Sequence, residues 1–359
     1  MKAITKTNVV KNIFFLAISL VSLSAFAQEE GDKKFNFSGS ADVYWKTNLT
    51  GTNQAMEDDE GNVFFNTPPT SFANRSGFSL GMANLIASYE GEKVGFVADL
   101  VFGPRGEDAV FLSTGSSNIV NQLYVYWNVS ESVRLTMGNF NTFLGYEVIS
   151  PVGNFNYSTS YMFSYGPFSH TGIKADFTLS DDFSLMLAVM NSTDFTEINL
   201  DGSYTAGAQL GYKGQYLNVL YGAQTFAPDK TFQIDYTGGF DLSDAFYLGI
   251  NTTYNNTDGS GFYGFALYPQ MTTSDKFSIG LRGEYFKEFE GGVSALGAYN
   301  PEGDADVYEF TLTGNYTISD LTLKPELRFD SASEDIFIDG DDEATGSLAS
   351  FLLAAVYSF

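Results

Sequence analysis

A serine and a histidine stand side by side at Ser169 and His170, and His170 is the only histidine in the chain. A histidine-activated serine can hydrolyse esters or amides, but successive residues of a strand point to opposite faces, so these two side chains would not meet. One histidine cannot build a histidine-rich metal site, and the chain has no cysteine. We predict no catalytic residue, no metal and no cofactor, and a structural role for His170, hydrogen-bonded to the loop that precedes it.

Charged residues flank this position on two alternating segments. His170, Lys174 and Asp176 would share the polar face of HTGIKADFTL, and Arg134 alternates with apolar neighbours in the same way. Glu147 is the one acid at the centre of the loop between the two segments. Two interpretations stay open: Glu147 faces Arg134 and Lys174 and sets a transverse electric field, or it forms a salt bridge that only anchors the loop.

The loop itself, residues 141–169, is long and unusually aromatic. A loop in water would not carry so many Phe and Tyr side chains, and long structured loops usually have a function. We expect it to fold inward and narrow an interior channel; the alternative is packing against neighbouring loops outside. The candidate residues for the constriction and the inner wall are Glu147, Asn154, Tyr157, His170, Arg134, Lys174, Asp176, Arg282, Glu284 and Arg328.

The elements that must position these residues are strands. After the turn Ser319-Asp320, LTLKPELRFD alternates strictly between apolar side chains and polar or charged ones. A soluble sandwich also alternates, but repeated charges on one side need water and large apolar residues on the other need lipid or a second sheet. Seven tight turns predict an all-β, transmembrane, antiparallel up-and-down barrel of about 16 strands, with short periplasmic turns and long extracellular loops. Outward-going strands would start near Phe35, Lys93, Val133, Phe183, Gln215, Ala245, Lys276 and Leu321.

Both ends of the chain fit export to a membrane. Residues 1–27 have three lysines, a short apolar run and Ala25-Phe26-Ala27, the pattern of a cleaved secretory signal peptide. Residues 28–359 would then form the barrel. The chain ends in SFLLAAVYSF, with Tyr357 and Phe359 on an apolar face suited to lipid. We expect this strand to present the assembly signal to the barrel-assembly machinery.

Composition narrows the function further. The formal net charge is −25, which excludes unaided nucleic-acid binding. The chain has 34 Phe, 22 Tyr and 36 Gly, and after residue 27 it has no long apolar run of the kind that spans a bilayer as a helix. A barrel of 16 strands leaves an aqueous channel that strand side chains cannot fill.

The third loop also carries a family resemblance. The pattern consists of Gly138, Phe140, Thr142, Gly145-Tyr146-Glu147, Asn154, Tyr157-Ser158, Ser160, Phe163, Pro167 and His170-Thr171-Gly172. Together with the preceding VNQLYVYWNV, it resembles the OmpL-like β-barrel porins common in Bacteroidetes. The resemblance covers about 55 residues. It implies an outer-membrane porin but names no solute and no catalytic residue.

These observations predict a porin of the cell outer membrane that passes small hydrophilic solutes or ions by diffusion and is not an enzyme. The expected partners are the lipid bilayer, the solutes and the assembly machinery, and a homotrimer is compatible with a barrel of this size. Two alternatives remain: an outer-membrane hydrolase with its site among the loops, and a surface adhesin or scaffold. A planar-bilayer conductance measurement separates them.

Overall fold

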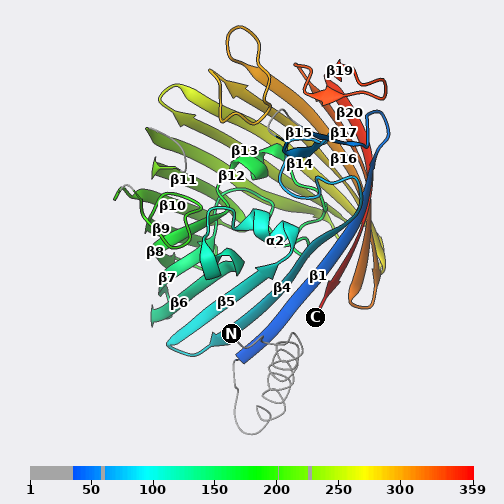
Figure 1. Cartoon of the computed structure of the whole chain (residues 1–359). Helices are drawn as coiled ribbons and strands as arrows, with labels where there is room; N and C mark the ends of the chain where they lie inside the picture. The colour runs from blue at the N-terminus through cyan, green and yellow to red at the C-terminus, as the bar shows by residue number, and fades with distance from the viewer. Residues whose placement is uncertain (1–34, 58–60, 201, 225–228) are drawn as a thin grey trace, which may run out of the picture.

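The computed structural model describes residues 35–57, 61–200, 202–224 and 229–359. Within these residues, sixteen antiparallel strands form one closed barrel in which each strand pairs with its neighbours in sequence and β20 closes on β1 (Figure 1). The predicted barrel and strand count are confirmed. The strands of the wall are β1 (Phe35–Asn48), β4 (Gly77–Glu90), β5 (Val94–Phe102), β6 (Val120–Ser130), β7 (Val133–Asn141), β8 (Ser169–Thr178), β9 (Phe183–Met190), β10 (Thr205–Tyr212), β11 (Gln215–Ala223), β12 (Lys230–Ser243), β13 (Phe246–Thr257), β14 (Ser260–Ser274), β15 (Phe277–Phe289), β16 (Ala305–Ile318), β17 (Leu321–Ala332) and β20 (Ser347–Ser358).

The tight turns define one end of the barrel. Lys213 and Gly214 both have positive φ at the β10–β11 turn, and Ser319 does at the β16–β17 turn, as tight hairpins require. The start of β1 lies at the same end as the last residue, because Gly39 and Phe359 exchange two backbone hydrogen bonds of 3.1 and 3.0 Å. Short turns mark the periplasmic end of an outer-membrane barrel, so the long loops lie at the extracellular end.

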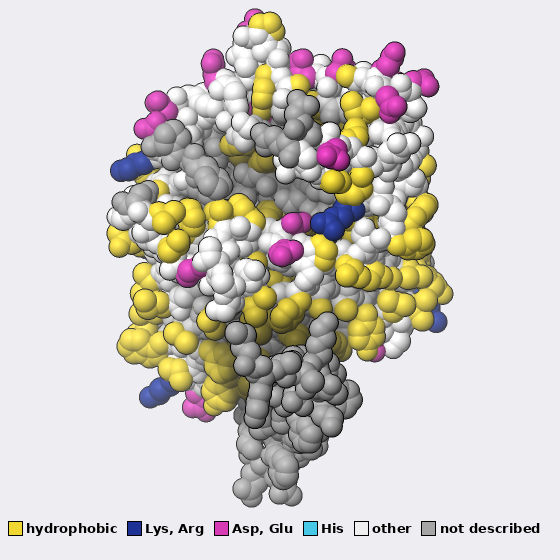
Figure 2. Space-filling view, in the orientation of Figure 1, with side chains coloured by type: hydrophobic (Ala, Val, Ile, Leu, Met, Phe, Trp, Pro, Cys, Tyr) yellow, Lys and Arg dark blue, Asp and Glu magenta, His cyan; other side chains and the backbone are white. Residues whose placement is uncertain are grey.

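Alternation separates the two faces of the wall, as β17 shows. Leu327 and Phe329 are exposed on the outer surface, whereas Glu326, Arg328 and Asp330 are buried inside. Figure 2 shows the outward residues as a broad hydrophobic band, with acidic side chains gathered above it. The band matches the hydrocarbon core of a bilayer, which therefore supplies the apolar environment that the outer face needs.

Smaller elements lie in the long connections. They are β2 (Ala55–Glu57) with β3 (Val63–Phe65), β18 (Phe337–Ile338) with β19 (Ala344–Thr345), α2 (Pro104–Ala109), the 3₁₀ turn η1 (Gly115–Ile119) and α3 (Tyr161–Tyr165). The β2–β3 hairpin belongs to the first loop and is separate from the barrel wall. The first and last loops are neighbours, because Asn66 exchanges hydrogen bonds with the backbone of Ile338. None of the described helices has both the length and the apolar character needed to cross a membrane.

Candidate pore-constriction site

The third loop (residues 142–168) connects β7 to β8 and has almost no secondary structure of its own apart from α3. Its backbone N–H groups donate instead to carboxylates of the inner wall. Glu326 on β17 accepts from Tyr157 N (2.5 Å) and Ser158 N (3.0 Å). Glu284 on β15 accepts from Tyr161 N (2.7 Å) and Met162 N (2.8 Å). Buried backbone donors need partners, and here the wall supplies them.

Basic side chains bind the carbonyl groups of the same loop. Lys324 Nζ donates to Pro151 O (2.9 Å) and Asn154 O (2.5 Å). Arg105 of α2 donates to Ile149 O (2.8 Å) and Tyr157 O (3.2 Å). The conformation of the loop is therefore specified by charged residues that lie far from it in sequence.

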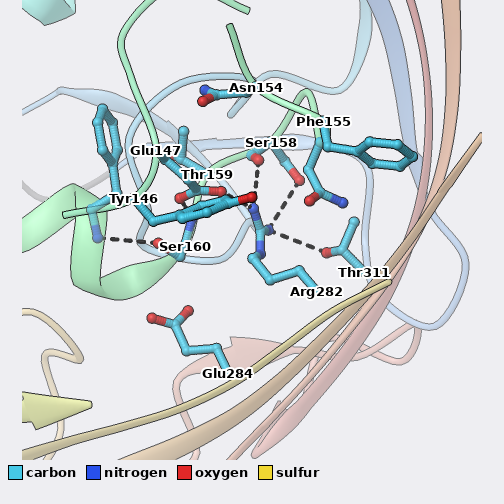
Figure 3. A network of polar contacts seen from close by, with 12 residues as sticks. Tyr146, Glu147, Asn154, Phe155, Ser158, Thr159, Ser160, Arg282, Glu284 and Thr311 are labelled. Atoms are coloured by element: carbon cyan, nitrogen blue, oxygen red, sulfur yellow. Dashed lines mark hydrogen bonds and ion pairs between the residues drawn. The ribbon is translucent and has the colours of Figure 1, made fainter. Parts of the chain in front are cut away.

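An ionic network joins the centre of the loop to β15, β16 and β17. Arg282 Nη1 lies 2.6 Å from Glu147 Oε1, and Arg282 Nε lies 2.9 Å from Glu309 Oε2. Arg282 also donates to Ser158 O at 2.7 Å and to the hydroxyl of Thr311 at 3.2 Å. Figure 3 shows the guanidinium directed into the bend of the loop, between Ser158 and Thr311. All of these side chains are buried.

The second oxygen of Glu147 completes this arrangement. It accepts from Ser160 N at 2.7 Å, next to the start of α3. Ser160 caps that helix through its own hydroxyl, which accepts from Phe163 N. Loss of Arg282 would leave the buried Glu147 carboxylate without compensation, whereas loss of Glu147 would leave Arg282 paired with Glu309.

Glycines on the inner wall form seats for the large side chains of the loop. Phe143 lies over Gly207 on β10, Tyr146 over Gly249 on β13, Phe155 over Gly280 on β15, and Met162 over Gly264 on β14. At each of these positions a Cβ atom would overlap the loop side chain. We call these four positions the glycine seats. They fix where the loop sits by shape, independently of the ion pairs.

The loop reaches the opposite side of the barrel as well. Tyr157 is fully buried, and its hydroxyl donates to Asp42 on β1 at 2.5 Å. Burial and the nearby Asp42 carboxylate raise the pKa of Tyr157 well above its usual range, so the phenol keeps the proton that it donates. On the β12 side, Gly145 N donates to Asp235 at 3.0 Å. The third loop thus extends across the barrel interior from β1 to β10, with its widest contact along β15–β17.

Cavities remain on the periplasmic side of the loop. One of about 850 Å³ lies along the inner face of β6–β8, and one of about 390 Å³ lies beneath Tyr146, Asn154 and Phe155. Two much smaller spaces, of about 10 Å³ each, separate the loop from β12–β13 and from the first loop. Open space is therefore wide below the loop and narrow beside it.

The structure brings most of the predicted residues to the loop. Glu147, Arg282 and Glu284 contact it as described, and Arg328 donates to Thr159 O at 2.9 Å and pairs with Asp330. Asn154 exchanges hydrogen bonds with the backbone of Val148. His170 is buried, with Nε2 3.0 Å from Thr142 Oγ1 and its ring beside Phe143.

Arg134, Lys174 and Asp176 lie elsewhere. They line the 850 Å³ cavity towards the periplasmic end, where Lys174 pairs with Asp176 at 3.2 Å. The predicted transverse field between Glu147 and the two basic residues, Arg134 and Lys174, is therefore wrong. The charge of Glu147 is compensated by Arg282, on another part of the wall. The alternative required a salt bridge, and Glu147 forms one with Arg282; that this salt bridge only anchors the loop stays a prediction.

Sequence reasoning missed several residues that hold the loop, including Glu309, Lys324, Glu326, Asp330 and Asp235. Their inward direction was readable from the alternation in β12, β16 and β17. Their partners were not, because these depend on how the loop crosses the barrel. The glycine seats also went unnoticed, although isolated glycines inside strands are a known sign of close approach.

A closed sixteen-stranded barrel with a lipid-facing belt and an ordered inward loop is the architecture of an outer-membrane porin. The family model described as "Putative beta-barrel porin-2, OmpL-like" matches residues 34–359, and the chain belongs to this family. It is an outer-membrane channel protein.

Solved structures support the fold. The chain is similar to the outer membrane channel DcaP of Acinetobacter baumannii, with 15% identity and a TM-score of 0.56, over 90% of this chain and 97% of that one. It is also similar to the anion-selective porin from Comamonas acidovorans, with 10% identity and a TM-score of 0.57, over 91% and 100%. OmpT of Vibrio cholerae, solved in a trimer form, gives 11% identity and a TM-score of 0.50 over 90% and 99%. Comparison with curated proteins gives no match.

Proposed function

We propose that the third loop sets the width of the passage, and that small hydrophilic solutes or ions cross beside it by passive diffusion. The observation that carries this proposal is the double attachment of the loop, by the Arg282 network and by the glycine seats. A loop fixed at this many points keeps its position without a ligand. The narrow spaces along its edges then limit what passes.

The two sides of the loop are held unequally. Towards β15–β17 it has ion pairs as well as charge-assisted hydrogen bonds, whereas towards β10–β13 the polar contacts of the described residues are hydrogen bonds, such as Gly145 N to Asp235 and Gln209 to Phe143 O. The inner wall there carries Asp235 beside uncharged amides and hydroxyls such as Gln233, Asn251 and Thr253. We therefore infer that solutes pass on the β10–β13 side, where moving the loop edge separates no ion pair among the residues that the structure describes.

We also propose that the chain has no enzymatic activity. Its one histidine is enclosed by Phe140 and Phe143 and bound to Thr142, so no substrate reaches it. Hydrolysis of ester substrates by the purified barrel at a rate that falls on His170→Ala substitution would overturn this part of the proposal.

Export and assembly are also proposals. Residues 1–27, which lie outside the described residues, would be a signal peptide cleaved after Ala27, and β20 would engage the assembly machinery through Tyr357 and Phe359. OmpT of Vibrio cholerae is known in a trimer form, and a homotrimer of this chain is proposed by analogy. Mass measurement of the detergent-solubilised barrel tests the trimer: a single monomer-sized species contradicts it.

The channel proposal is tested by solute entry into liposomes that contain the purified protein. Neutral sugars of increasing size should enter at rates that fall steeply with size, and a variant with residues 145–165 replaced by a short Gly-Ser linker should admit larger ones. If the largest sugar admitted is the same for the two proteins, the third loop does not set the width of the passage.

A further inference from the structure

The 850 Å³ cavity below the third loop has the features of a binding site as well as a passage. It opens at the periplasmic end, because the turn residues Glu92, Ser130 and Ser132 form its rim. Its inner part is lined by Gln122, Tyr124, Tyr126, Thr136 and Phe140, and the exposed Arg134 lies nearer the rim. A volume of this size fits a small organic molecule, and the lining combines aromatic rings with polar and charged side chains that could fix its orientation.

Arg134 is the prominent charge in this cavity. Its guanidinium lies over the ring of Tyr126, 4.2 Å from the centroid, and its Nε donates to Asn128 Oδ1 at 2.8 Å. Stacking and this hydrogen bond fix the plane of the group. In the parts of the chain that the structure describes, the two terminal nitrogens of Arg134 have no hydrogen-bond partner, and Arg134 takes part in no ion pair. An oriented guanidinium edge with free donors matches a planar anion.

The neighbouring charges leave this edge available. Lys174 is paired with Asp176 at 3.2 Å and also lies 5.5 Å from the centroid of the Phe140 ring. Asp176 is the register partner of Arg134 across β7 and β8 but directs its carboxylate to Lys174. Glu92 and Glu131 lie at the rim, among residues of the exposed turns. Lys93 also lines the cavity, beside the rim residue Glu92, and among the described residues neither Lys93 nor Arg134 forms an ion pair. Arg134 differs in that its charged group is held in a fixed plane, with Tyr124 and Phe140 supplying apolar surface deeper in the cavity.

We propose that this cavity binds a small organic carboxylate, with the carboxylate on the terminal nitrogens of Arg134 and the apolar body against Tyr124 and Phe140. The site would hold such a solute at the periplasmic side of the third loop. Although the surface of the channel is strongly acidic, this site would locally favour organic anions. This inference rests on the proposed function, since a solute must pass the loop to arrive from outside the cell.

The test is direct binding of benzoate and of its neutral isostere benzamide to the barrel in phosphatidylcholine nanodiscs, followed by ligand-observed NMR. The variants are Arg134→Gln, which removes the charge, and Arg134→Lys, which keeps the charge but not the planar fork. Lys213→Gln is the matched control, because Lys213 lies at the same periplasmic end, paired with Asp182 at 3.3 Å, and is not part of this cavity. Resistance of the folded band to sodium dodecyl sulfate on unheated gels checks that each variant is folded.

Wild type and Lys213→Gln should bind benzoate more tightly than benzamide, Arg134→Gln should lose roughly tenfold in benzoate affinity, and Arg134→Lys should fall between. Equal benzoate affinity in wild type and Arg134→Gln, or benzamide binding as tight as benzoate, would overturn the site. Binding needs no current, so a barrel that conducts without binding benzoate refutes this inference alone. One that binds without conducting refutes the channel proposal instead.

Discussion

At the scale of single residues, Arg282 is the side chain on which the position of the third loop depends most. Its side chain is fully buried and meets two carboxylates from different segments, Glu147 of the loop and Glu309 of β16. Desolvating three charges is costly, and only their close geometry offsets the cost. The result is a junction that favours one loop position over nearby ones, because a shifted loop would leave at least one charge unpaired.

Substituting Arg282→Met should therefore be far more damaging than substituting Glu147→Gln. The first leaves Glu147 buried without a counter-charge and Glu309 with only Arg328, at 3.8 Å, a cost of about 3–5 kcal/mol, whereas the second leaves Arg282 paired with Glu309. Denaturant unfolding of the barrel in detergent measures both. Equal stabilities for the two variants would show that Arg282 has no special place in the network.

The glycine seats give a second prediction at this scale. Gly249→Val should displace Tyr146 and destabilise the barrel by about 1–3 kcal/mol, because the seat has no room for a side chain. Gly283→Val is the matched control: this glycine also lies in a strand, but its nearest neighbour atom is 3.5 Å from an added Cβ. Similar unfolding midpoints for the two variants would mean that the seats do not position the loop.

At the scale of the elements, the barrel closes where the last strand, β20, pairs with the first strand, β1. Gly39 and Phe359 exchange backbone hydrogen bonds, and the Phe359 ring lies 6.2 Å from that of Phe37. Phe359→Ala should lower the fraction of chain that reaches a folded, heat-modifiable form in the outer membrane, while Phe329→Ala, the same substitution at another exposed phenylalanine on the outer face of β17, should not. Equal folded fractions for the two variants would show that Phe359 has no special role in the assembly of the barrel.

The strands were predictable because their pattern is local. Period-two alternation and Ser-Asp turns located β17 from Leu321 and β9 from Phe183 without knowledge of any partner. The site was only partly predictable. His170 and Glu147 were identified by residue type, but the pairing of Glu147 with Arg282 joins positions 135 residues apart and depends on how the barrel closes. Alternation determines which face of the wall a side chain lies on, but not its position along the barrel axis or its partner. Arg134 and Lys174 were therefore correctly predicted to point inward, but their predicted proximity to Glu147 was wrong.

At the scale of the whole molecule, three zones follow one another along the barrel axis. Acidic side chains gather above the hydrophobic belt, the third loop crosses the interior, and an open cavity lies along β6–β8 towards the periplasmic turns (Figure 2). The wall alone would leave a wide aqueous channel. The loop changes this, because the inner side chains of β15–β17 that would face water are instead buried against it.

Single-channel conductance in planar bilayers tests this account most directly. Wild-type barrels should open in small, reproducible steps, and barrels with residues 145–165 replaced by a short Gly-Ser linker should conduct several times more while remaining heat-modifiable. Wild-type steps as large as those of the shortened variant would contradict the claim that the third loop sets the passage.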